Sequence, residues 1–204
     1  MSKKLTNFIL VCACIIIVAS GIMIYKFKIP LKPLHDNSKL VLKPYPGMGG
    51  DFALRDVYGS VFDTKKQRGT YLLLYFGFTA CPDVCPNELN LFGNVLDGLG
   101  KNSEKLKIVF ITIDPKRDTR QQLKSYMANF HPAIIALTGS EEEIKHVADL
   151  YRVYYAKDND KDPDNYMLNH SSISYLIDKK GKFIHPFAPG TKTTEFLAVL
   201  KQLL

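Results

Sequence analysis

The chain has few cysteines, no repeats and no basic stripe, and each of these absences excludes a class of protein. Four cysteines in 204 residues are too few for the disulfide framework of a small secreted domain, and a chain of this length buries a core without one. No internal repeat is present, which favours one domain of ordinary size. The net charge is +7, but no basic stripe interleaved with aromatic residues accompanies it, so nucleic acid is not expected as a partner.

An uncharged, mostly apolar run over residues 8–25 follows a short N-terminal tail, residues 1–7. As a helix this run is about 27 Å long, close to the ~30 Å hydrocarbon core of a bilayer. A cleavable signal peptide is the alternative, since residues 19–21 are small, but its apolar stretch is usually only about 7 to 15 residues long. We expect an uncleaved membrane anchor, in which Cys12 and Cys14 are apolar side chains in lipid.

The rest of the chain divides into a tether and an α/β domain. Residues 26–50 are rich in proline, glycine and lysine and predict a tether. Residues 51–204 alternate strand and helix patterns, which predicts a mixed sheet flanked by helices. The expected elements, in chain order, are a hairpin turning at Tyr58 and Gly59, a strand over 70–78, a helix with Leu89, Phe92, Leu96 and Leu99 on one face, a strand over 107–114, a helix from Thr119 to about Phe130, a strand over 133–137, a helix with a capping box of Ser140 and Glu143, a loop over 157–165, a hairpin over 172–188 and a helix over 194–204.

Cys81 and Cys85 follow the first long strand, and a proline follows each of them. Loops at this end of the strands in open α/β sheets commonly carry function. A helix starting at Pro82 would place both sulfurs on one face; alternatively Cys85 caps the helix and Pro86 is its first residue. In either case the helix N-terminus favours the thiolate form.

A stabilising disulfide between these two cysteines is one interpretation, but closing so short a loop contributes only ~2 kcal/mol in the chain-entropy model. Thiolates also bind Cu(I), zinc or an iron-sulfur cluster, and two thiolates with one imidazole suit copper. His170 is a candidate because it directly precedes a strand that could lie beside the one ending at the cysteines. The other candidates are weaker: His35 in the tether, His146 in a helix, and His131 and His185, which both precede prolines and are expected in loops.

Four sequence blocks resemble, in order and spacing, the Sco/SenC family. They are "GFTACPDVCPNEL" (77–89), "DPKRDT" (114–119), "LTGSEEEI" (137–144) and "NHSSISYLID" (169–178). The resemblance covers roughly residues 45–204 and implies a thioredoxin-like fold on a membrane tether. It also implies that one copper ion is bound by Cys81, Cys85 and His170.

The family resemblance further implies a metallochaperone that assembles the copper A centre of cytochrome c oxidase, with oxidase subunit II as the partner. An upstream copper donor or a thiol reductant is a further expected partner. Two positions depart from the family pattern: Ala80 stands where many members have histidine, and Asn169 where many have aspartate. Loss of a negative charge at Asn169 would affect metal affinity and redox tuning more than ligation itself.

The resemblance also implies that the domain faces the periplasm or the mitochondrial intermembrane space. The first residues lack arginine, unlike a mitochondrial transit peptide. We therefore expect a single-pass protein of the bacterial inner membrane with its soluble domain in the periplasm, and the mitochondrial inner membrane is the alternative.

Two enzymes are rival interpretations of the same cysteines. A thiol-disulfide oxidoreductase, reducing the copper-ligand cysteines of the oxidase subunit, would use one cysteine to attack and the other to resolve. Thioredoxin-type proteins normally have two residues between their cysteines, whereas this chain has three. A peroxiredoxin-like peroxidase would need one cysteine of low pKa with an arginine nearby, and a second cysteine four residues away is not its usual arrangement.

Overall fold

The computed structural model describes residues 42–158 and 166–204. The predicted anchor over 8–25, together with Cys12, Cys14 and His35, lies outside the described residues. Within the described part of the chain, no helix has the length and apolar character needed to cross a bilayer.

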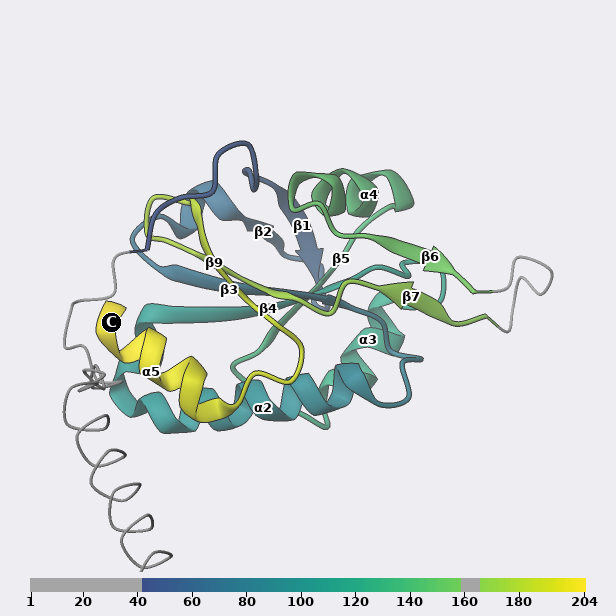
Figure 1. Cartoon of the computed structure of the whole chain (residues 1–204). Helices are drawn as coiled ribbons and strands as arrows, with labels where there is room; N and C mark the ends of the chain where they lie inside the picture. The colour runs from purple at the N-terminus through teal and green to yellow at the C-terminus, as the bar shows by residue number, and fades with distance from the viewer. Residues whose placement is uncertain (1–41, 159–165) are drawn as a thin grey trace, which may run out of the picture. The chain divides into compact units, whose positions relative to one another are not determined.

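A seven-stranded mixed sheet forms the centre of the domain (Figure 1). Its three middle strands are parallel to one another, and antiparallel strands flank them on both sides. The spatial order β2-β1-β5-β4-β3-β8-β9 comprises β1 (Ala53–Asp56), β2 (Val61–Asp63), β3 (Tyr71–Gly77), β4 (Leu106–Thr112), β5 (Ile135–Thr138), β8 (Ser174–Ile177) and β9 (Phe183–Phe187).

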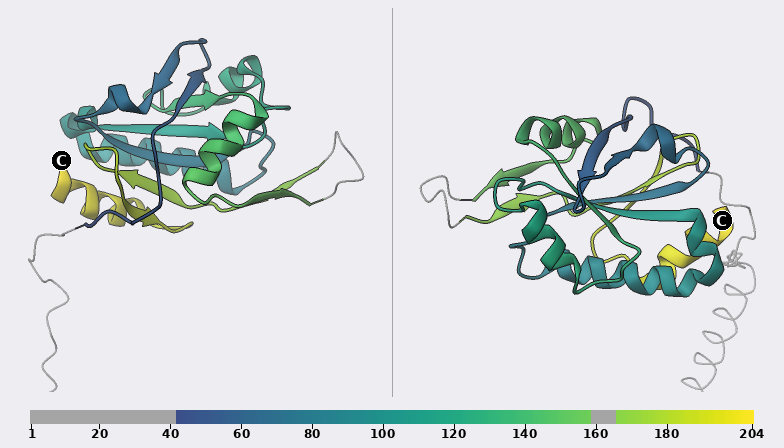
Figure 2. Two further views of the ribbon diagram at one scale, coloured as in Figure 1. Left: turned by 90° about the horizontal axis from the view of Figure 1, so that it is seen from above. Right: turned by 180° about the vertical axis from the view of Figure 1, so that it is seen from behind.

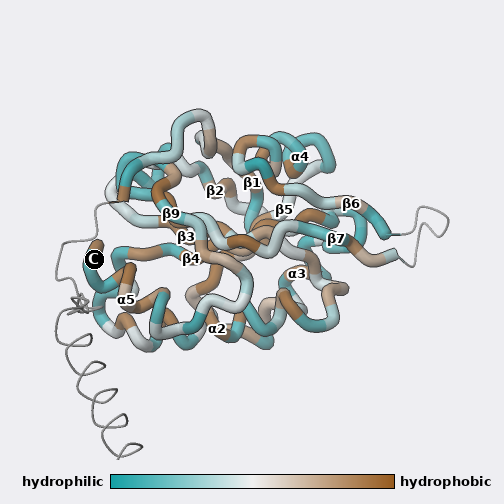
Figure 3. Tube along the Cα trace, viewed as in Figure 1, coloured by the Kyte–Doolittle hydropathy of each residue, from teal (hydrophilic) through white to brown (hydrophobic). Residues whose placement is uncertain are grey.

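Strands β3 and β4 are almost wholly buried, as continuous apolar runs covered on both faces should be. Hydrophobic residues accordingly concentrate in these strands (Figure 3). As predicted, β8 lies directly beside β3, with Tyr75 opposite Ser174. This pairing brings the chain after His170 close to the end of β3.

Helices cover both faces of the sheet. Helices α2, α3 and α5 lie on one face and α4 lies on the other (Figures 1 and 2). Two predicted caps are confirmed: Thr119 caps α3, and Ser140 and Glu143 form the capping box of α4. The bounds are α2 (Val84–Leu99), α3 (Arg120–Met127), α4 (Glu141–Leu150) and α5 (Thr193–Leu203), with short 3₁₀ turns at η1 (Thr64–Gln67) and η2 (Gly100–Lys105).

A separate two-stranded ribbon, which the sequence patterns did not predict, consists of β6 (Tyr155–Lys157) and β7 (Leu168–His170). It extends beyond the end of the large sheet (Figure 2). Its strands are antiparallel, with Tyr155 opposite His170. His170 therefore ends a strand of its own rather than lying in a loop before β8.

Two further expectations need adjustment. His185 was expected in a loop because Pro186 follows it, but both residues lie inside β9. β9 is the edge strand of the sheet, where a proline need not donate to a neighbour. Within the predicted tether, Tyr45 stacks on Phe183 with ring centroids 4.6 Å apart, and Gly49 donates a hydrogen bond to the carbonyl of Leu150, so packed structure begins before residue 51.

Candidate metal centre

Cys81 lies in the loop after β3, and Cys85 lies in the first turn of α2. Asp83 is the N-cap residue, so Cys85 is the second helical residue and Pro86 the third. This start falls between the two placements that the sequence left open. Pro86 is tolerated there because amides in the first turn have no partner within the helix. The backbone amide of Cys85 instead donates to Sγ of Cys81 at 3.4 Å.

Gly77 makes room for the thiol of Cys85 at the end of β3. A β-carbon on Gly77 would lie 2.8 Å from Sγ of Cys85 and 2.8 Å from the ring of Phe110. Real β-carbons do not approach so closely. Glycine at this position is therefore what allows Cys85, which is fully buried, to sit against the strand.

His170 approaches the same two sulfurs from the end of β7. Its Nε2 lies 3.7 Å from Sγ of Cys85, and the donor atoms of Cys81, Cys85 and His170 all lie within 4.8 Å of one another. The imidazole packs edge-on against Phe78, with ring centroids 5.8 Å apart. The structure thus brings together the three residues predicted from sequence, and within the described ranges no other group of three such side chains meets this spacing.

The two cysteines are free thiols with opposite electrostatic behaviour. The pKa of Cys81 is lowered to about 3, chiefly by the hydrogen bond between the two side chains. Burial partly opposes this shift, and a hydrogen bond with His170 adds to it. The same hydrogen bond, together with burial, raises the pKa of Cys85. At neutral pH Cys81 is therefore a partly exposed thiolate, and Cys85 is a buried thiol that donates to it.

Tyr75 adds a third contact to the buried sulfur, which sequence reasoning missed. Its hydroxyl donates to Sγ of Cys85 at 3.6 Å. Burial, reinforced by the neighbouring Cys85, raises the pKa of Tyr75, so the hydroxyl keeps its proton. The alternation of side chains along β3 could have indicated this contact, because Tyr75 and Gly77 lie on the same face of the strand, the face that meets the cysteines.

The donor set fits a soft metal ion. With metal-ligand distances of about 2.0 to 2.3 Å, three donors around one ion lie roughly 3.5 to 4 Å apart, near the observed separation of Cys85 and His170. Thiolates suit Cu(I) and imidazole suits copper, so this donor set is compatible with Cu(I). Binding would displace the proton of Cys85, because thiols ligate as thiolates. The three residues form a possible copper site.

The remaining candidate histidines lie elsewhere. His146 is exposed on α4, and His131 lies 3.6 Å from the carboxylate of Asp97. The two positions that depart from the family pattern, Ala80 and Asn169, are both exposed.

The SCO1/SenC family model matches residues 43–204. The chain belongs to the SCO1/SenC family. A SCO2-like protein of Rickettsia prowazekii is 41% identical over 202 residues, which is 98% of each chain. Yeast mitochondrial SCO1 is 43% identical over 141 residues, covering 68% of this chain and 48% of the yeast protein.

Solved Sco structures share the fold. Bradyrhizobium japonicum ScoI with copper bound superimposes with a TM-score of 0.71 at 39% identity, covering 77% of this chain and 99% of that one. Yeast Sco1 with copper bound gives a TM-score of 0.71 at 36% identity, covering 77% and 88%. The predicted family and thioredoxin-like mixed fold are confirmed. Both of these solved Sco structures have copper bound.

Proposed function

We propose that the chain is a membrane-anchored copper metallochaperone for the copper A centre of cytochrome c oxidase. Cys81, Cys85 and His170 hold one copper ion per chain. The observation that carries the proposal is that these three donors lie within 4.8 Å of one another. The cysteines come from the start of α2 and the loop before it, whereas the histidine comes from β7. Membership of the SCO1/SenC family, with copper-bound relatives, supports the same metal.

The partial exposure of the site allows copper to be released as well as bound. Cys81 and His170 are only partly buried, so thiolates of an acceptor protein can reach the ion and exchange with these ligands one at a time. Cys85 is buried and would be the last ligand to leave. Oxidase subunit II is the proposed acceptor, and the proposed location is the periplasmic face of a bacterial inner membrane, with residues 8–25 as the anchor and residues 26–50 as the tether.

One observation favours a second function, reduction of the subunit II cysteines. Cys81 is a partly exposed thiolate and Cys85 a buried thiol. A dithiol reductase likewise uses one reactive thiolate to attack and a second cysteine to resolve the mixed disulfide. In that reaction Cys81 attacks the partner disulfide, one partner thiolate leaves, and Cys85 then displaces the second. Cys81 and Cys85 are oxidised to a disulfide, and the partner gains two electrons, one proton from Cys85 and a second proton from solvent.

Mixing experiments with the full chain separate the two functions. Copper-loaded chain is added to reduced, copper-free subunit II domain, the two proteins are separated, and the copper on the domain is measured. Metal-free reduced chain is added in parallel to the disulfide form of that domain, and the thiols of the separated domain are counted. A chaperone transfers copper in the first reaction and produces few thiols on the domain in the second. Thiol release without copper transfer would reject the chaperone proposal in favour of the reductase.

A further inference from the structure

One short segment, Asp114–Asp118, is hydrogen-bonded to Thr79, which precedes Cys81, and to Tyr166, which precedes His170. Asp118, whose side chain is fully buried, makes the contacts to the loop that carries Cys81. The carboxylate accepts hydrogen bonds from the backbone amide of Thr79 at 3.0 Å and from the Thr79 hydroxyl at 2.6 Å. It accepts a third from the hydroxyl of Thr112 at 2.6 Å. A buried carboxylate is costly unless it is hydrogen-bonded, so these contacts hold Thr79, two residues before Cys81, in one place.

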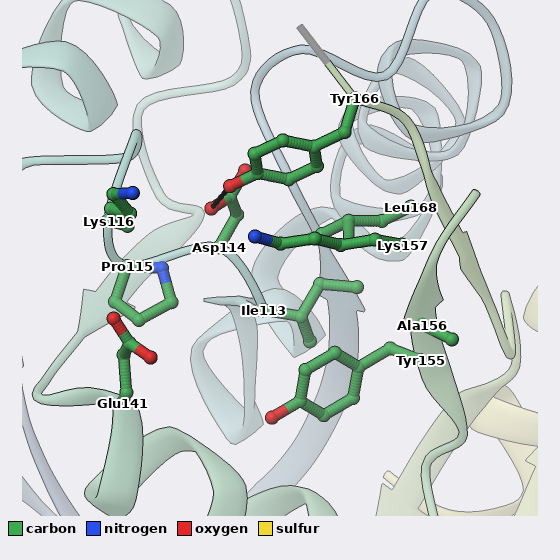
Figure 4. Close-up of a pocket in the computed structure, with 10 residues that line it drawn as sticks. All are labelled: Ile113, Asp114, Pro115, Lys116, Glu141, Tyr155, Ala156, Lys157, Tyr166 and Leu168. Atoms are coloured by element: carbon green, nitrogen blue, oxygen red, sulfur yellow. Dashed lines mark hydrogen bonds between the residues drawn. The ribbon is translucent and has the colours of Figure 1, made fainter. Parts of the chain in front are cut away.

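Asp114 and Arg117 make the contacts to the chain that leads into β7 and His170. The buried carboxylate of Asp114 accepts a hydrogen bond from the hydroxyl of Tyr166 at 2.7 Å (Figure 4). Arg117 donates to the other oxygen of Asp114 and, at 2.8 Å, to the backbone carbonyl of Tyr166. Its guanidinium also lies 3.7 Å above the Tyr166 ring. Burial raises the pKa of Tyr166 to about 12, which keeps the donating proton in place. Tyr166 lies two residues before β7, the strand that ends at His170.

The β6-β7 ribbon borders a pocket of about 170 Å³ that opens to solvent. Lys157 and Leu168 of the ribbon face Ile113 and Pro115 across this pocket (Figure 4). Beside the pocket, the hydrogen bonds that Tyr166 makes with Asp114 and Arg117 tie the chain before His170 to the rest of the domain.

We propose that Asp114–Asp118 is a positioning clamp for the metal centre. Asp118 holds the loop of Cys81, while Asp114 and Arg117 hold the strand of His170. The clamp sets the separation between the two thiols and the imidazole without contacting the ion itself. The inference builds on the proposed copper site, but the contacts that carry it belong to the metal-free protein.

Tyr166→Phe tests the histidine side, with Tyr151→Phe as the matched control. Each substitution removes one hydroxyl hydrogen bond of a buried tyrosine, because Tyr151 donates to the carbonyl of Gly50 at 3.1 Å. Loss of a hydrogen bond to a charged group should weaken Cu(I) affinity by roughly tenfold in Tyr166→Phe. Tyr151→Phe should bind Cu(I) as the wild type does. Equal Cu(I) affinities for the two variants, measured on the full chain by chelator competition, would overturn the clamp.

A double-mutant cycle shows through which ligand each contact acts. In a His170→Ala background, Tyr166→Phe should cause no further loss of Cu(I) affinity, because the ligand that it positions is gone. Thr79→Val, which removes one donor to Asp118 while keeping the side-chain shape, should weaken Cu(I) binding equally with or without His170. Asp118→Asn, a stronger form of the same change, should do so to a larger extent. An undiminished Tyr166→Phe effect without His170 would assign that residue a merely structural role.

Two copper-free measurements separate failure of the clamp from failure of the copper proposal. In the metal-free chain, Tyr166→Phe should shift the ring resonances of His170, the ligand that follows Tyr166 in the chain. Thr79→Val should shift the reduction potential of the Cys81–Cys85 pair, because Thr79 precedes Cys81 by two residues. These results stand even if the wild type binds no copper, which would reject the proposed function alone. Wild-type resonances in Tyr166→Phe together with a wild-type potential in Thr79→Val would reject the clamp whatever the metal does.

Discussion

Gly77 and Cys85 are packed so closely that a single added methyl group has no room between them. A β-carbon on Gly77 would lie 2.8 Å from the sulfur of Cys85. That contact joins the last residue of β3 to the first turn of α2. The position of the buried sulfur is therefore set by the strand, and it can be disturbed without changing any ligand.

Gly77→Ala should displace the Cys85 thiol and lower both stability and Cu(I) affinity. Overpacking of a well-packed interior typically costs about 1 to 3 kcal/mol, which urea unfolding of the full chain will measure. Gly98→Ala is the control, since its β-carbon would meet only the flexible end of Leu197, at 2.7 Å. That variant should keep wild-type Cu(I) affinity. A Gly77→Ala protein with unchanged Cu(I) affinity would show that the contact does not place the sulfur.

Cys81 should react with iodoacetamide before Cys85 in the metal-free chain. Cys81 is partly exposed with a lowered pKa, whereas Cys85 is buried with a raised pKa, and only the thiolate attacks. Peptide mapping after brief labelling distinguishes both from Cys12 and Cys14. Copper should protect Cys81 from the reagent. Equal labelling of the two site cysteines at early times would contradict the assigned protonation states.

Glu88→Gln should stabilise the fold at neutral pH. Glu88 is a buried acid on α2 whose pKa is raised by burial above 4.5, although a hydrogen bond from the amide of Gly190 partly opposes the shift. A raised pKa means that its contribution to stability is present below pH 4.5 and is lost as the pH rises through the folded-state value. Glutamine keeps an oxygen acceptor for Gly190 without the charge.

The free energy of unfolding of Glu88→Gln, from urea titrations, should therefore exceed that of the wild type at pH 7. The difference should shrink towards pH 4, where Glu88 is protonated. Glu104→Gln, at an exposed position, serves as the matched control and should leave the pH dependence unchanged. A gain in stability that is the same at pH 4 and pH 7 would show that ionisation of Glu88 is not its cause.

The strands of the large sheet, the helices and the cysteine pair were predictable because their signals are local. Apolar runs identified β3 and β4, and the Ser140 and Glu143 pair identified the start of α4. The β6-β7 ribbon was missed because its strands are short and their pairing depends on residues that are far apart in sequence. The roles of Tyr75, Asp118 and Tyr166 were missed for a similar reason, since each depends on a hydrogen bond to another element. The placement of His170 beside the sulfurs needed the family resemblance as well as the chain itself.

Copper binding by the reduced full chain tests the central claim most directly. Chelator competition should give one Cu(I) per wild-type chain, and His170→Ala should lose at least about tenfold in affinity, or ~1.4 kcal/mol. His146→Ala removes an exposed histidine from α4 and should bind Cu(I) like the wild type. Equal affinities for His170→Ala and His146→Ala, or no tight binding by the wild type, would contradict the copper site of Cys81, Cys85 and His170.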